Sequence, residues 1–130
     1  SMPLPDLAKH YAGADVIADA VLRDEIVVNE MQKRAFNLTQ ARAVAESEAD
    51  TPGAATSIFN YIEAEYVKDQ LELQNRIRGT QAFGWEGDSF TSEEIGMCRL
   101  NLEAKSISIA GGSNEIQLNI IAKRVLGLPD

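Results

Sequence analysis

The chain has 130 residues, of which 45% are hydrophobic, and its formal net charge is -8 at pH 7. This length suits one globular domain with a modest core. The negative charge and the scarcity of basic clusters argue against nucleic acid or an anionic membrane surface as a partner, because both require a positive patch. Cys98 is the single cysteine, so no internal disulfide can form and a reducing, cytoplasmic compartment is expected. No apolar run reaches membrane-spanning length.

The first residues are expected to form a lead-in to the folded domain. Ser1 before Met2 is typical of a residue left by a cleaved tag. The stretch from Pro3 to Gly13 contains two prolines and has room for at most a couple of helical turns. Residues 1–14 are therefore assigned to the lead-in, and residues 15–130 to the domain.

Two long helices are predicted next. From Ala14 to Thr51 there is neither Gly nor Pro, and apolar residues recur at helical spacing, with Asp15 as the expected N-cap. Further apolar residues lie beside this stripe, which favours contacts on two sides, in a bundle interior or a subunit interface. Thr51 and Pro52 suit the N-cap and first position of a second helix, which is expected to run until Gly79.

A third helix is predicted after a glycine-rich loop at residues 79–89. Thr91 and Glu94 have the spacing of a capping box, in which each side chain accepts a hydrogen bond from the backbone of the other residue. The helix is therefore expected to begin near Ser92 and to continue to about Ser108.

A fourth helix is predicted from Asn114 to Leu126. Ser113 with Asn114 supplies an N-cap, and Lys123 lies in the last turn, where a cation suits the helix dipole. Gly127 then ends the helix. Four helices joined by short loops predict an all-α fold, an antiparallel four-helix bundle.

A metal centre and a nucleophilic triad both lack candidate residues. Four-helix bundles often hold two metal ions through Glu-x-x-His motifs, but His10 is the only histidine and it lies outside the predicted helices. One histidine and one cysteine do not support a zinc site either. We expect no bound metal, and we expect His10 to be a surface residue.

The last stretch of the chain resembles the acyl-CoA dehydrogenase family. The family pattern runs Ile-Tyr-Glu-Gly-Thr-Ser-Glu/Gln-Ile-Gln and then an isoleucine-rich helix with basic residues. Residues 109–117 read IAGGSNEIQ, residues 120–124 read IIAKR, and the ending is VLGLP. In this register Gly111 stands where the family usually has its catalytic Glu. The resemblance therefore implies no catalytic residue in this loop.

A second match lies in the glycine-rich loop. Residues 81–87 read QAFGWEG and resemble the family loop Gln-x-x-Gly-Gly-x-Gly-Tyr, which contacts the FAD of the neighbouring subunit, although Trp85 replaces the second Gly. The residues that the resemblance implies at FAD are Gln81, Gly84, Trp85, Ser113, Asn114, Glu115 and Gln117, and those implied at the acyl-CoA substrate are Gly111, Gly112 and Lys123.

The resemblance implies that the chain is the C-terminal, FAD-contacting and oligomerisation domain of an acyl-CoA dehydrogenase. Such enzymes of fatty acid metabolism dehydrogenate acyl-CoA thioesters between the α and β carbons, and homo- or hetero-oligomers are expected. The alternative is a non-catalytic helical dimerisation or interaction module derived from the family. Gly111, Trp85 and the weak match of residues 9–13 to the family's Arg-x-x-Phe-Gly motif favour this alternative.

Overall fold

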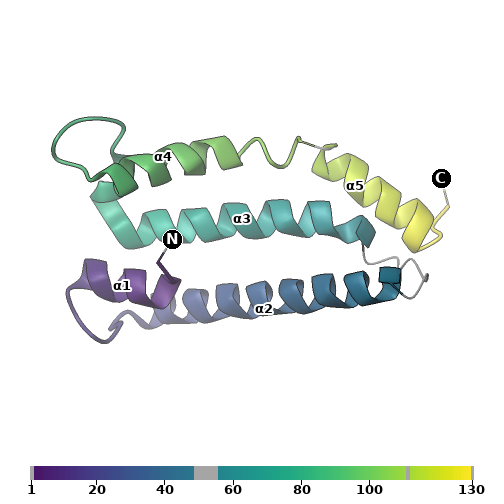
Figure 1. Cartoon of the computed structure of the whole chain (residues 1–130), viewed down its shortest axis with the longest axis horizontal. Helices are drawn as coiled ribbons and strands as arrows, with labels where there is room; N and C mark the ends of the chain where they lie inside the picture. The colour runs from purple at the N-terminus through teal and green to yellow at the C-terminus, as the bar shows by residue number, and fades with distance from the viewer. Residues whose placement is uncertain (1, 49–55, 111, 130) are drawn as a thin grey trace.

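The computed structural model describes residues 2–48, 56–110 and 112–129. Every regular element in these residues is helical, so the all-α prediction is confirmed (Figure 1). The α-helices are α1 (Leu4–Ala12), α2 (Ala20–Glu48), α3 (Thr56–Arg78), α4 (Ser92–Ala104) and α5 (Asn114–Ile120). A 3-10 helix, η1 (Gly79–Phe83), extends α3, and a π-helix, η2 (Ile121–Val125), extends α5.

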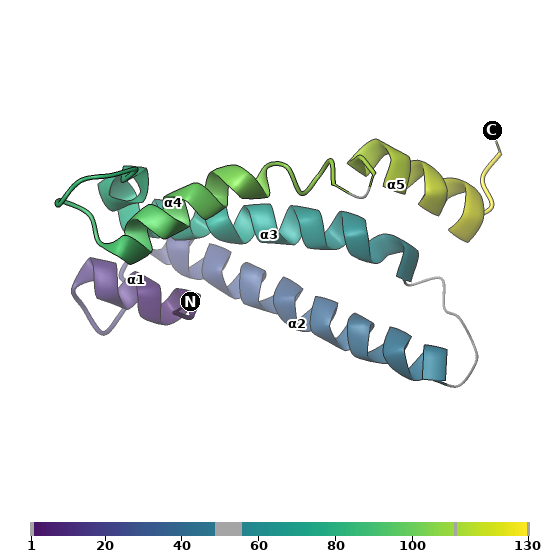
Figure 2. The same cartoon turned by 45° about the horizontal axis from the view of Figure 1, so that its top comes forward.

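Helix α3 is the centre of the arrangement. It packs against α1 and α2 on one side and against α4 and α5 on the other, and α2 runs antiparallel to it (Figure 1, and from a second angle in Figure 2). Helix α2 forms no comparable interface with α4 or α5 in the described chain. A closed four-helix bundle is therefore not confirmed, because α3 separates the helices that would close it.

The N-terminal segment is part of the core rather than a lead-in. In α1, Leu4 and Leu7 are only 1% and 2% exposed, and they cluster with Ile26 of α2 and Leu73 of α3. The helix ends at Gly13, whose φ of 63° lies in the left-handed region that glycine adopts without strain. The nine residues of α1 bury one face because its leucines recur three residues apart.

Helix α2 begins later than its sequence suggests. The predicted start with Asp15 as N-cap is wrong, because the helix begins at Ala20. Asp19 caps it instead, and its Oδ1 accepts hydrogen bonds from the backbone N–H of Val21 (2.9 Å) and of Leu22 (3.0 Å). The absence of Gly and Pro permitted a helix upstream of Asp19 but did not require one.

The predicted break at residues 51–53 lies outside the described residues, whereas the capping box that starts α4 is confirmed. The Thr91 hydroxyl accepts from the backbone N–H of Glu94, and the Glu94 carboxylate accepts from the N–H of Thr91. Helix α4 ends at Ala104, before the predicted Ser108. The Ser106 hydroxyl donates to the carbonyl of residue 103 and so competes with helix propagation.

Helix α5 begins as predicted. The Ser113 hydroxyl accepts from the backbone N–H of Ile116 at 3.4 Å, so Ser113 is the N-cap. After Ile120 the backbone continues as the π-helix η2, and Gly127 with a φ of 66° follows it. None of the helices in the described ranges is both long enough and apolar enough to cross a membrane.

Candidate functional site

The glycine-rich loop follows α3 and returns the chain to α4. Gln81 lies in η1, is partly buried, and its Oε1 atom is buried without a hydrogen-bond partner in the described chain. A buried carbonyl oxygen without a donor is costly, and a ligand with an N–H or O–H group would satisfy it. Gln81 is thus the residue of this loop with capacity for a further contact.

Gly84 serves packing inside the same loop. A Cβ atom built on Gly84 would lie 2.4 Å from the Phe90 ring, and the φ of Gly84 is an ordinary -68°. Glycine is therefore required here because the Phe90 ring lies against the backbone. That ring covers the Gly84 backbone on the side of the missing Cβ atom.

Trp85 is anchored to α4. The Arg99 guanidinium lies 5.0 Å from the centroid of the Trp85 ring and donates a 3.1 Å hydrogen bond to the Trp85 carbonyl oxygen. Such a stacked cation and ring attract each other through the ring quadrupole. Trp85 nevertheless stays 52% exposed and Phe83 79% exposed, so the loop presents two aromatic side chains to solvent.

The second set of implied residues lies in the turn before α5. Gly112 has a φ of 108°, and a Cβ atom there would lie 3.0 Å from the Gln117 amide nitrogen, so the turn requires glycine. The Glu115 carboxylate accepts from its own backbone N–H and from the Ser113 hydroxyl, and both contacts lower its pKa. Gly111 lies outside the described residues.

Asn114 connects this turn to α3. Its amide nitrogen donates a 2.5 Å hydrogen bond to Glu65 Oε1, which also accepts from the Lys68 ammonium at 2.7 Å. The Lys68 contact is the largest cause that lowers the pKa of Glu65, burial opposes it, and the Asn114 amide lowers the pKa further. Asn114 is therefore a structural link between α5 and α3.

The two sets of implied residues lie at different places along α3. Gln81 follows the C-terminal end of α3, whereas Asn114 bonds to Glu65, 13 residues before that end. At 1.5 Å per residue the two levels are roughly 20 Å apart. Lys123 lies further on, in η2. One copy of the chain thus carries the two sets of residues on separate surfaces.

A hollow that the sequence did not reveal lies between α2 and α3, with a volume of about 460 Å³. Phe36 of α2 meets Phe59 edge-on at 5.8 Å between centroids and stacks with Tyr66 at 6.4 Å. Burial, and then the nearby charge of Glu30, raises the pKa of Tyr66. Glu65 also lines the hollow, and it is bonded to Asn114. The hollow therefore lies beside the first turn of α5. Phe36 and Phe59 lie on different helices, so their contact depends on how α2 packs against α3.

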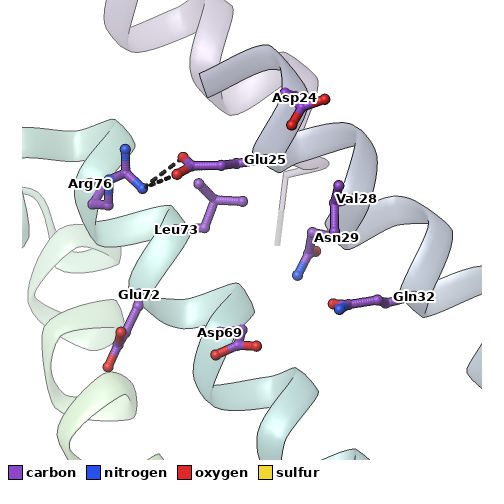
Figure 3. Close-up of a pocket in the computed structure, with 9 residues that line it drawn as sticks. All are labelled: Asp24, Glu25, Val28, Asn29, Gln32, Asp69, Glu72, Leu73 and Arg76. Atoms are coloured by element: carbon purple, nitrogen blue, oxygen red, sulfur yellow. Dashed lines mark hydrogen bonds and ion pairs between the residues drawn. The ribbon is translucent and has the colours of Figure 1, made fainter. Parts of the chain in front are cut away.

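A second hollow, of about 340 Å³, lies further along the same pair of helices and is acidic (Figure 3). Its charged lining residues are Asp24, Glu25, Asp69, Glu72 and Arg76. Arg76 pairs with Glu25 at 2.6 Å, and Glu72 pairs with Lys105 of the neighbouring α4. The remaining negative charge opposes the phosphates of a nucleotide or of CoA. No group of side chains suited to a metal ion occurs in the described ranges.

The sole histidine is exposed, as predicted. His10 lies on the surface of α1, and its ring stacks edge-on against Tyr11. Tyr11 belongs to a polar network with Glu94 and the buried Arg78. This network joins α1 to the start of α4 inside the fold.

The groups that the loop after α3 leaves free can be compared with the groups of a flavin nucleotide. The unpaired Gln81 oxygen suits a donor group of the cofactor, such as a ribose hydroxyl or an amine, and the exposed aromatic side chains suit a flat ring system. The Gly84 backbone does not suit a phosphate, because the Phe90 ring covers it. Gln81 is therefore the residue of this loop whose free acceptor suits a donor group of FAD.

Comparison with known proteins identifies the family. Residues 8–126 match the family model described as acyl-CoA dehydrogenase, C-terminal domain. The chain is 32% identical over 126 residues to acyl-CoA dehydrogenase IpdE1 of Mycolicibacterium smegmatis, covering 97% of this chain and 29% of that protein. The same-named protein of Mycobacterium tuberculosis is also 32% identical, with 97% and 31% covered. No solved structure was found to match.

The chain thus spans less than one third of the length of these two relatives. The helical content of the described residues agrees with the family match. The chain therefore belongs to the acyl-CoA dehydrogenase family, and it carries the C-terminal helical domain of that family.

Proposed function

We propose that the chain is the FAD-contacting and oligomerisation domain of an acyl-CoA dehydrogenase that forms a double bond between the α and β carbons of acyl-CoA thioesters. The observation that carries this proposal is the buried Gln81 oxygen, which has no partner in the described chain and lies in the loop with two exposed aromatic side chains. Bound FAD would supply the hydride acceptor for this reaction. Gln81 would orient the cofactor by accepting a hydrogen bond.

The turn before α5 is proposed to lie near the flavin and the acyl-CoA. Its Ser113 hydroxyl is used as an N-cap and Asn114 is bonded to Glu65, so these two residues would shape the site rather than take part in proton transfer. Glu115 is exposed and remains ionised at neutral pH, because its contacts lower its pKa. Gly112, Gln117 and Lys123 are proposed contacts as well.

Self-association is part of the proposal. Many large apolar side chains of the described chain are exposed, and exposed apolar surface of this kind is typical of contacts between protein chains. They include Val27, Met31 and Leu38 of α2, Leu100 and Leu102 of α4, and Ile116 and Leu118 of α5. Sedimentation at tens of micromolar should therefore show oligomers, and a clean monomer would contradict this part.

Flavin binding is tested on the full-length protein that contains this domain. The purified protein should show the absorbance of oxidised flavin at about 450 nm. Gln81→Ala should lower the flavin content severalfold, whereas Asn119→Ala, on the exposed side of α5, should not change it. Equal flavin content in both variants would exclude the proposed contact of Gln81.

The second candidate function is a helical interaction module without a redox role. Two contacts inside the loop favour this candidate: the Phe90 ring packs against Gly84, and Arg99 binds Trp85. Both contacts give these loop residues a structural role that needs no ligand. Such a module would carry no flavin even in its longest form. It would still self-associate, so flavin absorbance separates the two functions.

The chain by itself is expected to be inactive as a dehydrogenase. In the register of the family, Gly111 offers no carboxylate to remove the α-proton of the substrate. The resemblance implies a strand-rich domain beside the flavin in the complete enzyme, and the described residues contain no strand. Turnover of an acyl-CoA with an artificial electron acceptor by the purified chain would overturn this expectation.

A further inference from the structure

Helix α2 carries two regular faces on opposite sides. The inner face packs against α3, and its residues recur at spacings of three, four or seven. They are Leu22, Ile26, Asn29, Phe36 and Ala43, and all are buried or half-buried. This spacing is that of a coiled-coil seam. The ion pair between Glu25 and Arg76 adds to this contact between α2 and α3.

The outer face shows the same spacing, and no helix of the described chain packs over it. Pro5 of α1 lies at its border, and Asp24 at its edge also lines the hollow between α2 and α3. Its residues recur at alternating intervals of four and three, and all are exposed: Ala20, Asp24, Val27, Met31, Arg34 and Leu38. Val27 is 54%, Met31 66% and Leu38 61% exposed. The outer face is offset from the inner face by two residues, about 200° around a helix with 3.6 residues per turn, so the two faces point in opposite directions.

The charges on the outer face are unpaired in the described chain. Asp24 and Arg34 make no hydrogen bond or ion pair there, whereas the other cations of α2 all have partners. Arg23 donates to a carbonyl oxygen, and Lys33 and Arg42 face glutamates. Arg34 is thus the cation of α2 that remains available to another molecule.

The order of residues on this face is self-complementary. From Asp24 the face reads acid, apolar, apolar and base, ending at Arg34. When a second identical helix lies antiparallel, each acid meets a base and each apolar residue meets an apolar residue. In a two-fold interface every such contact occurs twice.

We infer that α2 pairs antiparallel with α2 of a second copy of this chain, about a two-fold axis level with residue 29. In this register Asp24 faces Arg34 of the second copy, and Val27 faces its Met31. Ala20 and Leu38 close the two ends. This inference deepens the self-association part of the proposed function, and it rests on that part.

The shape of the surface supports this occupant. A shallow depression of about 510 Å³ lies beside Val27 and Met31 and is bordered by Pro5 of α1, so it can receive side chains of a facing helix. The overlap from Ala20 to Leu38 is roughly 27 Å long at 1.5 Å per residue. A parallel pair would instead place Asp24 against Asp24 and Arg34 against Arg34, which repel.

A charge exchange tests the pairing. Asp24→Arg and Arg34→Asp each place two like-charged pairs in the seam, so each should weaken the dimer by about tenfold as measured by sedimentation equilibrium. The double variant restores opposite charges and should return the dissociation constant to within about threefold of the parent value. Additive weakening in the double variant would overturn the inference. Circular dichroism would show that each variant keeps its helices.

Cross-linking tests the register directly. In a Cys98→Ser background, protein with Ala20→Cys is mixed with protein with Leu38→Cys and treated with a short bis-maleimide. The inferred register predicts a mixed cross-linked dimer and little product from either protein alone, because residue 20 faces residue 38 and lies roughly 27 Å from residue 20 of the second copy. Efficient cross-linking of Ala20→Cys protein to itself would show a parallel pair and overturn the inference.

The two tests separate failure of the seam from failure of the proposed function. A monomer in sedimentation would remove both self-association and the seam. A dimer that is insensitive to the charge exchange and gives no mixed cross-link would contradict the pairing of α2 with α2 but not self-association itself. Flavin content, measured in parallel on the longest form of the protein, reports on the cofactor role independently of both.

Discussion

The Tyr11 hydroxyl donates a 2.8 Å hydrogen bond to Oε1 of Glu94, which joins α1 to α4 across 83 residues of sequence. The other oxygen of Glu94 accepts from the Thr91 backbone N–H at 2.7 Å. One buried carboxylate therefore caps α4 and fixes α1 at the same time. The Arg78 side chain is 1% exposed, and its guanidinium lies 5.8 Å from the centroid of the Tyr11 ring.

Removal of the Tyr11 hydroxyl should destabilise the fold. Tyr11→Phe keeps the ring but leaves Glu94 without one of its donors, which should cost about 1.5 kcal/mol, the usual range for a hydrogen bond to a charged group. Thermal unfolding should then occur a few degrees lower. Tyr61→Phe is the control, because the Tyr61 hydroxyl makes no hydrogen bond in the described chain. Equal melting temperatures for both variants would contradict the role of Tyr11.

The stability of the fold should depend on the charge of Glu94. The Thr91 backbone N–H is the largest cause that lowers the pKa of Glu94, followed by the Tyr11 hydroxyl. A carboxyl group with a lowered pKa in the folded state stabilises that state above its ordinary pKa of about 4.3, and this contribution is lost as the pH falls through the folded-state value.

Urea unfolding between about pH 5 and pH 3 measures this loss. Glu94→Gln should be less stable than the parent at neutral pH and should lose less free energy of unfolding over that interval. Glu63→Gln, on the exposed side of α3, should follow the parent curve. If the Glu94→Gln curve runs parallel to that of the parent, Glu94 does not contribute to the acid sensitivity.

Two glycines offer a matched pair of alanine substitutions. Gly84→Ala should destabilise the fold by about 1–3 kcal/mol, because the new Cβ atom would lie 2.4 Å from the Phe90 ring. Gly96 lies inside α4 with nothing within 4 Å of a built Cβ atom. Gly96→Ala should therefore stabilise the fold by roughly 0.5–1 kcal/mol. Chemical denaturation would measure both, and effects of the same sign would contradict this assignment.

The stacking of Trp85 on Arg99 has an optical signature, because Trp85 is the single tryptophan. Arg99→Ala removes the guanidinium that covers one face of the ring, so the fluorescence maximum should move to longer wavelength as the indole becomes more hydrated. Arg42→Ala, which affects only an ion pair on α2, serves as the control. An unchanged maximum in Arg99→Ala would show that the loop does not keep this contact in solution.

The sequence was most informative at the helix starts, because caps are local. The reciprocal bonds of Thr91 and Glu94, and the acceptor role of Ser113, involve residues three apart and need no other part of the chain. The start of α2 was misplaced for a related reason. Both Asp15 and Asp19 are suitable caps by residue type, and only the packed structure selects Asp19.

The candidate site was only partly accessible from sequence. The resemblance selected Gln81 and the turn before α5, but it could not reveal that Phe90 occupies the space beside Gly84. It also could not reveal the aromatic hollow, because Phe36 and Phe59 lie on different helices and their contact depends on how α2 and α3 are aligned. Such contacts depend on helix register, which periodicity alone does not fix.

The sequence by itself determined the helical class, the family and the capped starts of α4 and α5, because apolar spacing and cap chemistry act over a few residues. Only the tertiary structure decided that Leu4 and Leu7 belong to the core and that α3 separates α2 from α4 and α5. Those outcomes depend on which apolar faces meet, since burial of an apolar surface is favourable against any partner and specifies none in particular.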